Sequence, residues 1–67
     1  MNITINANSC DVPNEALLIT VLEDQNVANG KGVAVAVNNN VIQRAQWDSY
    51  ILKENDNILI IRATQGG

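Results

Sequence analysis

The chain has 67 residues, 46% of them hydrophobic, and a formal net charge of −3. This length allows a single small domain, here over residues 1–67. One cysteine, Cys10, and no histidine exclude an intramolecular disulfide and a Cys/His zinc site as stabilising elements. The core must therefore form by packing of aliphatic side chains.

The same composition indicates where the protein works. The N-terminal residues show neither the basic region nor the apolar run of a signal peptide, and the lack of a disulfide framework is typical of a reducing compartment. The longest apolar stretch, Val33–Val37, is far shorter than the about 20 residues of a membrane span. The four basic residues are dispersed, which argues against nucleic acid as a partner. We expect a cytoplasmic protein that binds neither membranes nor nucleic acid.

The first elements are predicted to be two short strands. Ile3 and Ile5 alternate with polar residues, the pattern of a half-buried strand. Asn8–Ser9 predicts a turn, after which Cys10–Val12 returns as a second short strand.

A helix is predicted to follow Pro13. Asn14 is suited to cap its first turn, and Glu15 would face the positive end of the helix dipole. Apolar residues between Ala16 and Leu22 supply a broad buried face, and the helix should run from about residue 15 to residue 25. The β-branched run Ile19–Val21 leaves a strand as the alternative.

The second half of the chain is typical of strands separated by asparagine-rich turns. After a loop at residues 29–32, Val33–Val37 predicts a strand with valines on one face and Ala34 and Ala36 on the other. A turn at residues 38–40 precedes more extended chain at 41–42, and residues 44–49 predict a short helical turn or an irregular crossover. Another turn at 54–57 leads to Ile58–Ile61, a continuous apolar run that predicts a strand buried on both faces. Residues 64–67 would leave the fold as a tail.

This order of elements predicts an α+β domain with one helix across one face of a small mixed sheet. If the first and last strands pair centrally, the tail emerges from the middle of the sheet. Ala34 and Ala36 would then contribute to a flat face suited to docking.

The composition excludes most kinds of catalytic site. Without histidine there is no Ser-His-Asp or Cys-His nucleophilic pair, and residues 30–32 lack the rest of a phosphate-binding fingerprint. The carboxylates fall mainly in predicted loops or at helix ends, where solvation and capping explain them, and Cys10 is interpreted as a packed or incidental thiol. An enzyme acting by itself is therefore disfavoured.

The remaining candidate is the terminal Gly66–Gly67. Two residues without a Cβ atom make the thinnest possible peptide, which can enter a narrow active site at any backbone angle. The Gly67 carboxylate could then be activated by transfer of AMP from ATP and attacked by a sulfur or amine nucleophile on a partner. The competing interpretation is a flexible chain end without function.

Several segments resemble the ThiS-type sulfur carriers of thiamine biosynthesis over most of the chain. The likeness rests on residues 34–38, on 41–44 with Trp47, on 56–59 and on the Gly-Gly end. The family usually shows proline before Arg44, glycine before Asp56 and alanine before the final glycines, where this chain has Gln43, Asn55 and Gln65.

The resemblance implies a β-grasp (ubiquitin-like) fold and a carrier role. A ThiF-type adenylyltransferase would activate Gly67 with ATP and magnesium, while the chain itself binds no cofactor. A cysteine-desulfurase persulfide would supply the sulfur of a thiocarboxylate, and thiazole synthase (ThiG-type) would receive it. Gly66 would be needed for steric reasons, so that the tail can enter the active site of a partner. Trp47 is interpreted as covering the edge of the core, whereas Arg44 either tethers the crossover or contacts an acidic partner.

Three alternatives stay open from the sequence. The small subunit of molybdopterin synthase shares the fold and terminus, and a protein-conjugating ubiquitin-like modifier would end in an isopeptide bond from Gly67. A passive binding module would dock through its sheet and make no use of the tail.

Overall fold

The structure is a computed structural model, and it describes residues 1–27 and 31–62. Its elements in chain order are β1 (Asn2–Ile5), β2 (Asn8–Asp11), α1 (Leu18–Asp24), β3 (Val33–Val37), β4 (Asn40–Val41), the 3₁₀ turn η1 (Arg44–Gln46) and β5 (Asn57–Arg62). The predicted order of two strands, a helix and three strands is confirmed.

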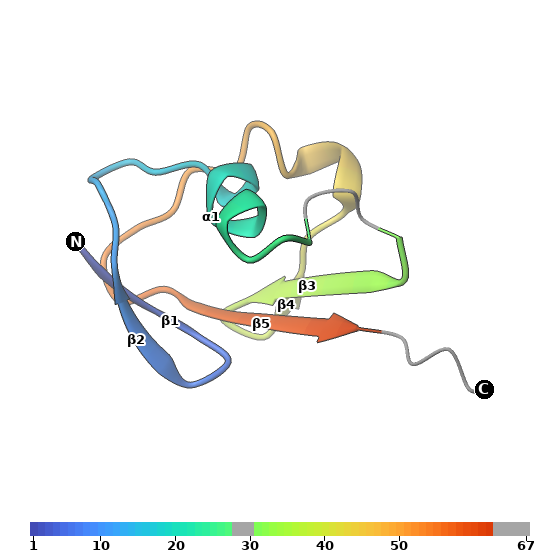
Figure 1. Ribbon diagram of the computed structural model, residues 1–67. Coiled ribbons are helices and arrows are strands. Elements are labelled where there is room, and N and C mark those ends of the chain that lie inside the picture. The colour runs from blue at the N-terminus through green and yellow to red at the C-terminus, as the bar shows by residue number, and fades with distance from the viewer. Residues whose placement is uncertain (28–30, 63–67) are drawn as a thin grey trace.

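The strands form one mixed sheet in the order β2-β1-β5-β3-β4. β1 runs parallel to β5, and the other neighbouring strands are antiparallel. Helix α1 lies on one side of this sheet (Figure 1). The predicted α+β class is therefore confirmed, and β5, the last strand, is at the centre of the sheet.

The core lies between α1 and the sheet. Leu18, Val21 and Leu22 recur at the spacing of one helix face and are buried, as expected for an amphipathic helix. They belong to one cluster with the buried strand residues and with the crossover between β4 and β5. Its other members are Ile3, Ile5, Val27, Val35, Val37, Ile42, Trp47, Leu52, Ile58 and Ile60.

The predicted turn at Asn8–Ser9 is wrong, because both residues belong to β2. The chain reverses instead at Asn6 and Ala7, which have φ angles of 49° and 71°. Asn6 is also fixed to β5, since its N–H donates to the Ile58 carbonyl and its Oδ1 accepts from the Ile60 N–H at 2.8 Å. These contacts with a distant strand place the turn two residues earlier than local sequence indicated.

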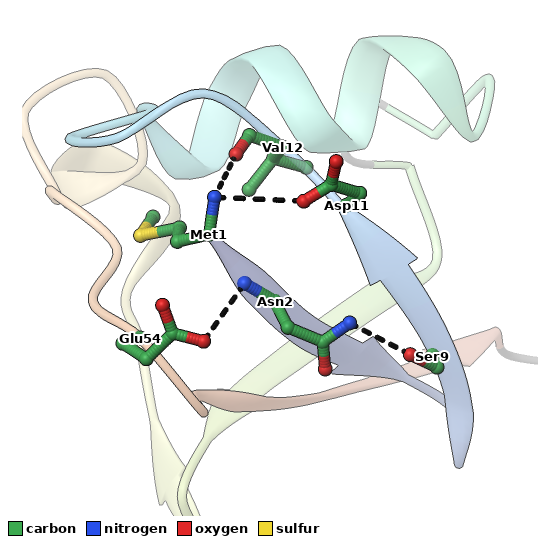
Figure 2. A network of polar contacts seen from close by, with 6 residues as sticks. All are labelled: Met1, Asn2, Ser9, Asp11, Val12 and Glu54. Carbon is green, nitrogen blue, oxygen red and sulfur yellow. Dashed lines mark hydrogen bonds and ion pairs between the residues drawn. The ribbon is translucent and has the colours of Figure 1, made fainter.

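Polar contacts hold β1 to the segments beside it (Figure 2). The Met1 ammonium donates to the Val12 carbonyl at 2.6 Å and lies 3.5 Å from Asp11 Oδ1. Asn2 donates from its backbone N–H to Glu54 Oε2 at 2.9 Å and from its side chain to Ser9 Oγ at 2.8 Å. Glu54, expected to be merely solvated, thus links β1 to the turn before β5.

The helix starts later than predicted. Its N-cap residue is Leu17, which makes no side-chain cap, and Glu15 has a φ of 62° that excludes it from a helix. Neither Asn14 nor Glu15 therefore has the capping role assigned to it. The start is fixed by tertiary backbone bonds: the Leu18 N–H donates to the Tyr50 carbonyl, and Leu17 forms an isolated bridge with Ile51. A helix at Ile19–Val21 is confirmed against the strand alternative.

Candidate functional site

The predicted site residues, Gly66 and Gly67, and the whole predicted tail lie outside the described residues. What the structure describes is the base from which that tail starts. β5 ends at Arg62, so five residues separate its end from the chain terminus. Five residues reach at most about 17 Å when fully extended. Any protein that acts on Gly67 must bring its reactive groups within that distance of Arg62.

β5 is paired with β3 up to Arg62 and with β1 at its first two residues. β3 pairs with β5 over five positions, from Val33 opposite Arg62 to Val37 opposite Ile58. On the other side, β1 pairs with it at Asn57 and Ile58. Ile58 and Ile60 point into the core with 0% and 8% of their surface exposed. The tail therefore starts from a strand that ladder bonds and core packing both fix.

Asp56, directly before β5, is the buried polar residue of this region, with 6% of its surface exposed. Its Oδ1 accepts from Asn38 Nδ2 at 2.9 Å, and its Oδ2 accepts from the Lys53 N–H at 2.8 Å. Asn38 also accepts the Asn57 N–H at 2.9 Å through Oδ1. Solvation and capping, the explanation expected for the carboxylates, is therefore wrong for Asp56. Its carboxylate fixes the start of β5 to the β3–β4 turn.

Two departures from the ThiS pattern fit the backbone geometry. Asn55, where the family usually has glycine, has a φ of 70°, a left-handed conformation that asparagine tolerates better than most residues. Gln43, where the family usually has proline, has a φ of −62°, which is the angle proline itself adopts. Each residue is thus compatible with the backbone angle at its position. The third, Gln65, lies outside the described residues.

The predicted burial of β5 on both faces is wrong. Leu59 and Ile61 alternate with the core residues and are 47% and 53% exposed. The register places Ala34 beside Ile61, and Ala36 between Leu59 and Val41. We call these five residues (Ala34, Ala36, Val41, Leu59 and Ile61) the outer apolar face. The prediction that the two alanines lie opposite the inward valines is confirmed, and the face is more apolar than alanines by themselves would make it.

Arg62 lies at the end of β5 on the side of the helix. Its guanidinium NH2 donates to the carbonyl of Gln25, the C-cap residue of α1, at 3.1 Å. A cation at the C-terminal end of a helix is also favourable towards the helix dipole. This contact connects the last residue of the central strand with the helix that covers the core.

The structure also describes the other three residues that the sequence analysis named, which are Trp47, Cys10 and Arg44. Trp47 is 2% exposed and donates from its indole Nε1 to the Ile42 carbonyl at 3.0 Å, which confirms its assignment to the core. Cys10 is half-buried and packs against the core, in agreement with a packed thiol. The Arg44 carbonyl accepts the Trp47 N–H at 3.1 Å, but the Arg44 side chain makes no hydrogen bond or ion pair with any residue that the structure describes, so its guanidinium does not tether the crossover in this way. It lines an open hollow of about 510 Å³ together with Ile19 and Trp47.

Within residues 1–27 and 31–62, no group of three or more acidic, cysteine or histidine side chains is arranged to hold a metal ion. In the same ranges, no helix has the length and hydropathy needed to cross a membrane. What the described residues do present is an exposed apolar face of the sheet and a strand end fixed by its pairing with β3.

A mixed five-stranded sheet covered by one helix, with the last strand at its centre, defines a β-grasp protein. The family model of the ThiS family matches residues 3–67. The chain belongs to the ThiS family, and membership supports the role of a sulfur carrier in thiamine biosynthesis rather than that of an enzyme.

Solved structures agree with this assignment. The crystal structure of the thiamine biosynthesis protein ThiS from Geobacter metallireducens is similar with a TM-score of 0.82 and 26% identity, covering 100% of both chains. The solution structure of a thiamine biosynthesis protein from Geobacter metallireducens gives a TM-score of 0.78 and 26% identity, covering 100% of this chain and 88% of that one. A comparison with curated proteins gives no match.

Proposed function

We propose that this chain carries sulfur for the thiazole ring of thiamine as a thiocarboxylate on Gly67. The observation that carries the proposal is membership of the ThiS family over residues 3–67 in a chain that ends in Gly-Gly. The fold supports it, because the central strand β5 leads into that end from a fixed base. The chain would act in the cytoplasm as a protein co-substrate, with catalysis supplied by its partners.

The proposed chemistry has two stages. A ThiF-type adenylyltransferase, using ATP and magnesium, lets the Gly67 carboxylate oxygen attack the α-phosphate, which releases pyrophosphate and leaves an acyl-adenylate. The terminal sulfur of a cysteine-desulfurase persulfide then attacks the acyl carbon and expels AMP. A second thiol cleaves the resulting acyl disulfide by disulfide exchange and releases the thiocarboxylate.

The thiocarboxylate would deliver its sulfur to a ThiG-type thiazole synthase. Gly66 matters for steric reasons, since a side chain at this position widens the peptide that enters each active site. No residue of this chain needs to transfer a proton in this scheme.

The test is an intact-mass measurement of the chain after incubation with ATP, magnesium, a ThiF-type enzyme and a persulfide donor. We expect one oxygen to be replaced by sulfur in the wild-type chain and no change in a Gly67 deletion. Gly66→Ala, which keeps the terminal carboxylate, should react much more slowly. A deletion variant that gains sulfur as readily as the wild type would refute the proposal, and adducts with lysines of other proteins would identify a conjugating modifier instead.

A further inference from the structure

The peptide groups of β5 face its two neighbouring strands alternately. On the side of β3, the Asn57 carbonyl accepts from the Asn38 N–H. On the side of β1, the Ile58 carbonyl accepts from the Asn6 N–H. Odd-numbered residues of β5 therefore bond towards β3 and even-numbered ones towards β1. By this alternation the N–H and C=O of Arg62, the last residue of the strand, face the side of β1.

The backbone bonds of the sheet end before Arg62 on both sides. Asn6, directly after β1, accepts the Ile60 N–H through Oδ1 at 2.8 Å. The chain then turns away into β2, while β5 continues past this turn (Figure 1). On the side of β3, the alternation makes Ile61 and Ala34 the last hydrogen-bonded pair. Within the described residues, the ladder of the sheet therefore fixes Ile61 but not Arg62.

The side chain of Arg62 supplies the missing attachment. Its Nη2 donates to the Gln25 carbonyl at 3.1 Å, and this carbonyl is available because the last carbonyl groups of a helix have no donor within the helix. The acceptor is itself held in place. Two residues later the Val27 N–H donates to the Leu22 carbonyl, and both side chains are buried in the core. Arg62 is thus attached to the end of α1 rather than to the sheet.

This attachment determines where the tail begins. With Arg62 fixed, five residues separate a defined point from the chain terminus. Without the bond, the last fixed residue is Ile61, and one more residue rotates freely. An enzyme that acts on Gly67 must order every freely rotating residue before it, and each has an entropic cost. A longer free segment therefore lowers the share of bound carriers whose terminal carboxylate lies at the reacting atom.

We propose that Arg62 is a positioning residue for the chemistry at Gly67, because its bond to the end of α1 fixes the point and the direction from which the tail starts. The proposal rests on the carrier function proposed above. Arg62 acts through the backbone and contacts neither the nucleotide nor the carboxylate. Loss of its guanidinium should therefore slow adenylation within the complex and leave the affinity for the enzyme unchanged.

The first measurement needs no partner protein. Arg62→Met removes the donor and the charge but keeps an unbranched side chain, and Arg62→Lys keeps a cationic donor. In ¹⁵N relaxation of the full-length chain, we expect the amide order parameter at position 62 to be about 0.85 in the wild type. It should fall below about 0.6 in Arg62→Met and stay near the wild-type value in Arg62→Lys.

The second measurement uses a purified ThiF-type enzyme. The rate of pyrophosphate release with ATP and magnesium, at saturating carrier, should fall about threefold in Arg62→Met, as for the loss of one exposed hydrogen bond. Arg62→Lys should restore most of this rate. The dissociation constant measured without ATP should stay that of the wild type in both variants.

Arg44→Met is the matched control. It removes the same guanidinium and the same charge at an exposed position whose side chain bonds to no described residue. At saturating carrier it should release pyrophosphate at the wild-type rate, and its order parameter at position 62 should not change. A rate loss in Arg44→Met equal to that in Arg62→Met would assign the effect to net charge and overturn the proposal.

The remaining outcomes separate positioning from contact and from function. A weaker affinity of Arg62→Met with an unchanged rate would show that Arg62 contacts the enzyme directly, and it would overturn the positioning role. An order parameter that Arg62→Met leaves unchanged would overturn it as well. Lost order at position 62, with no pyrophosphate release even from the wild type, would confirm the attachment but refute the carrier function and, with it, the role of Arg62 in that chemistry.

Discussion

Strand β5 presents two different surfaces with neighbouring residues of nearly the same chemistry. Ile58 and Ile60 point inward and have almost no exposed surface, while Leu59 and Ile61 point outward and are about half exposed. Inward side chains exclude water together with α1, so they contribute to folding. Outward side chains stay in contact with water after folding, so they contribute little to stability. Their surface is therefore available for binding. In this small domain, alternate residues of one strand divide into a buried set that stabilises the fold and an exposed set that leaves an apolar surface.

The largest expected effect tests the inward side. Ile58→Ala should reduce the free energy of unfolding by about 2–5 kcal/mol, because it leaves a cavity at a site with 0% exposure. Leu59→Ala, its outward neighbour, should cost less than about 1 kcal/mol. Urea denaturation followed by Trp47 fluorescence measures both values.

Because a loss of that size could leave Ile58→Ala unfolded, Ile58→Val provides a graded variant with an expected cost of about 0.5–1.5 kcal/mol. Similar costs for Ile58→Ala and Leu59→Ala would break the distinction between the two faces.

A second, smaller effect tests how the start of β5 is held. Asp56→Ala removes the acceptor of two hydrogen bonds and leaves the Lys53 N–H and the Asn38 amide without it, at a cost of about 1–3 kcal/mol. Asp48→Ala is the control, since Asp48 is an exposed carboxylate and its loss should change stability by less than about 0.5 kcal/mol. Equal unfolding midpoints for the two variants would show that core packing alone fixes the strand.

The smallest expected effect concerns the turn before β5. Asn55→Gly should leave stability within about 0.5 kcal/mol of the wild type, since glycine accepts a φ of 70° without strain. Asn55→Ala should be less stable than Asn55→Gly by about 1 kcal/mol, because a Cβ atom without a locally bonding side chain disfavours this conformation. Thermal unfolding of the pair measures the difference. An alanine variant as stable as the glycine variant would show that the left-handed turn places no demand on residue 55.

Sequence patterns predicted the elements well where local and tertiary demands agree. The alternating β1 and the valine-alanine strand β3 are found at the expected residues, the latter with the same bounds. The predictions failed where a contact between residues far apart in the sequence determines the local structure. The start of α1 follows from the backbone bond to Tyr50, and the first turn is determined by contacts of Asn6 with β5. Capping and turn preferences of single residues cannot contain that information.

The candidate site shows the same division. A run of four apolar residues, 58–61, does not reveal whether one face or both are covered, so the exposure of Leu59 and Ile61 required the structure. The role of Asp56 was also missed, because its partner Asn38 is 18 residues earlier in the chain. By contrast, Gly66 and Gly67 were singled out by sequence, and their chemistry stays a prediction.

The central position of β5 would affect how the proposed carrier is transferred from one enzyme to the next. If Gly67 carries the sulfur as proposed, a reach of about 17 Å from Arg62 requires each enzyme that acts on it to approach the same end of the same strand. Under the proposed function, two enzymes that both act on Gly67 could not occupy this strand end at the same time, so the adenylating enzyme would have to dissociate before the sulfur acceptor binds. Flux then depends on the off-rates of two complexes, and an excess of either enzyme sequesters the carrier from the other. Overproducing a catalytically inactive acceptor would thus lower the rate of sulfur transfer, because it would bind the carrier and leave less of it for the active enzymes.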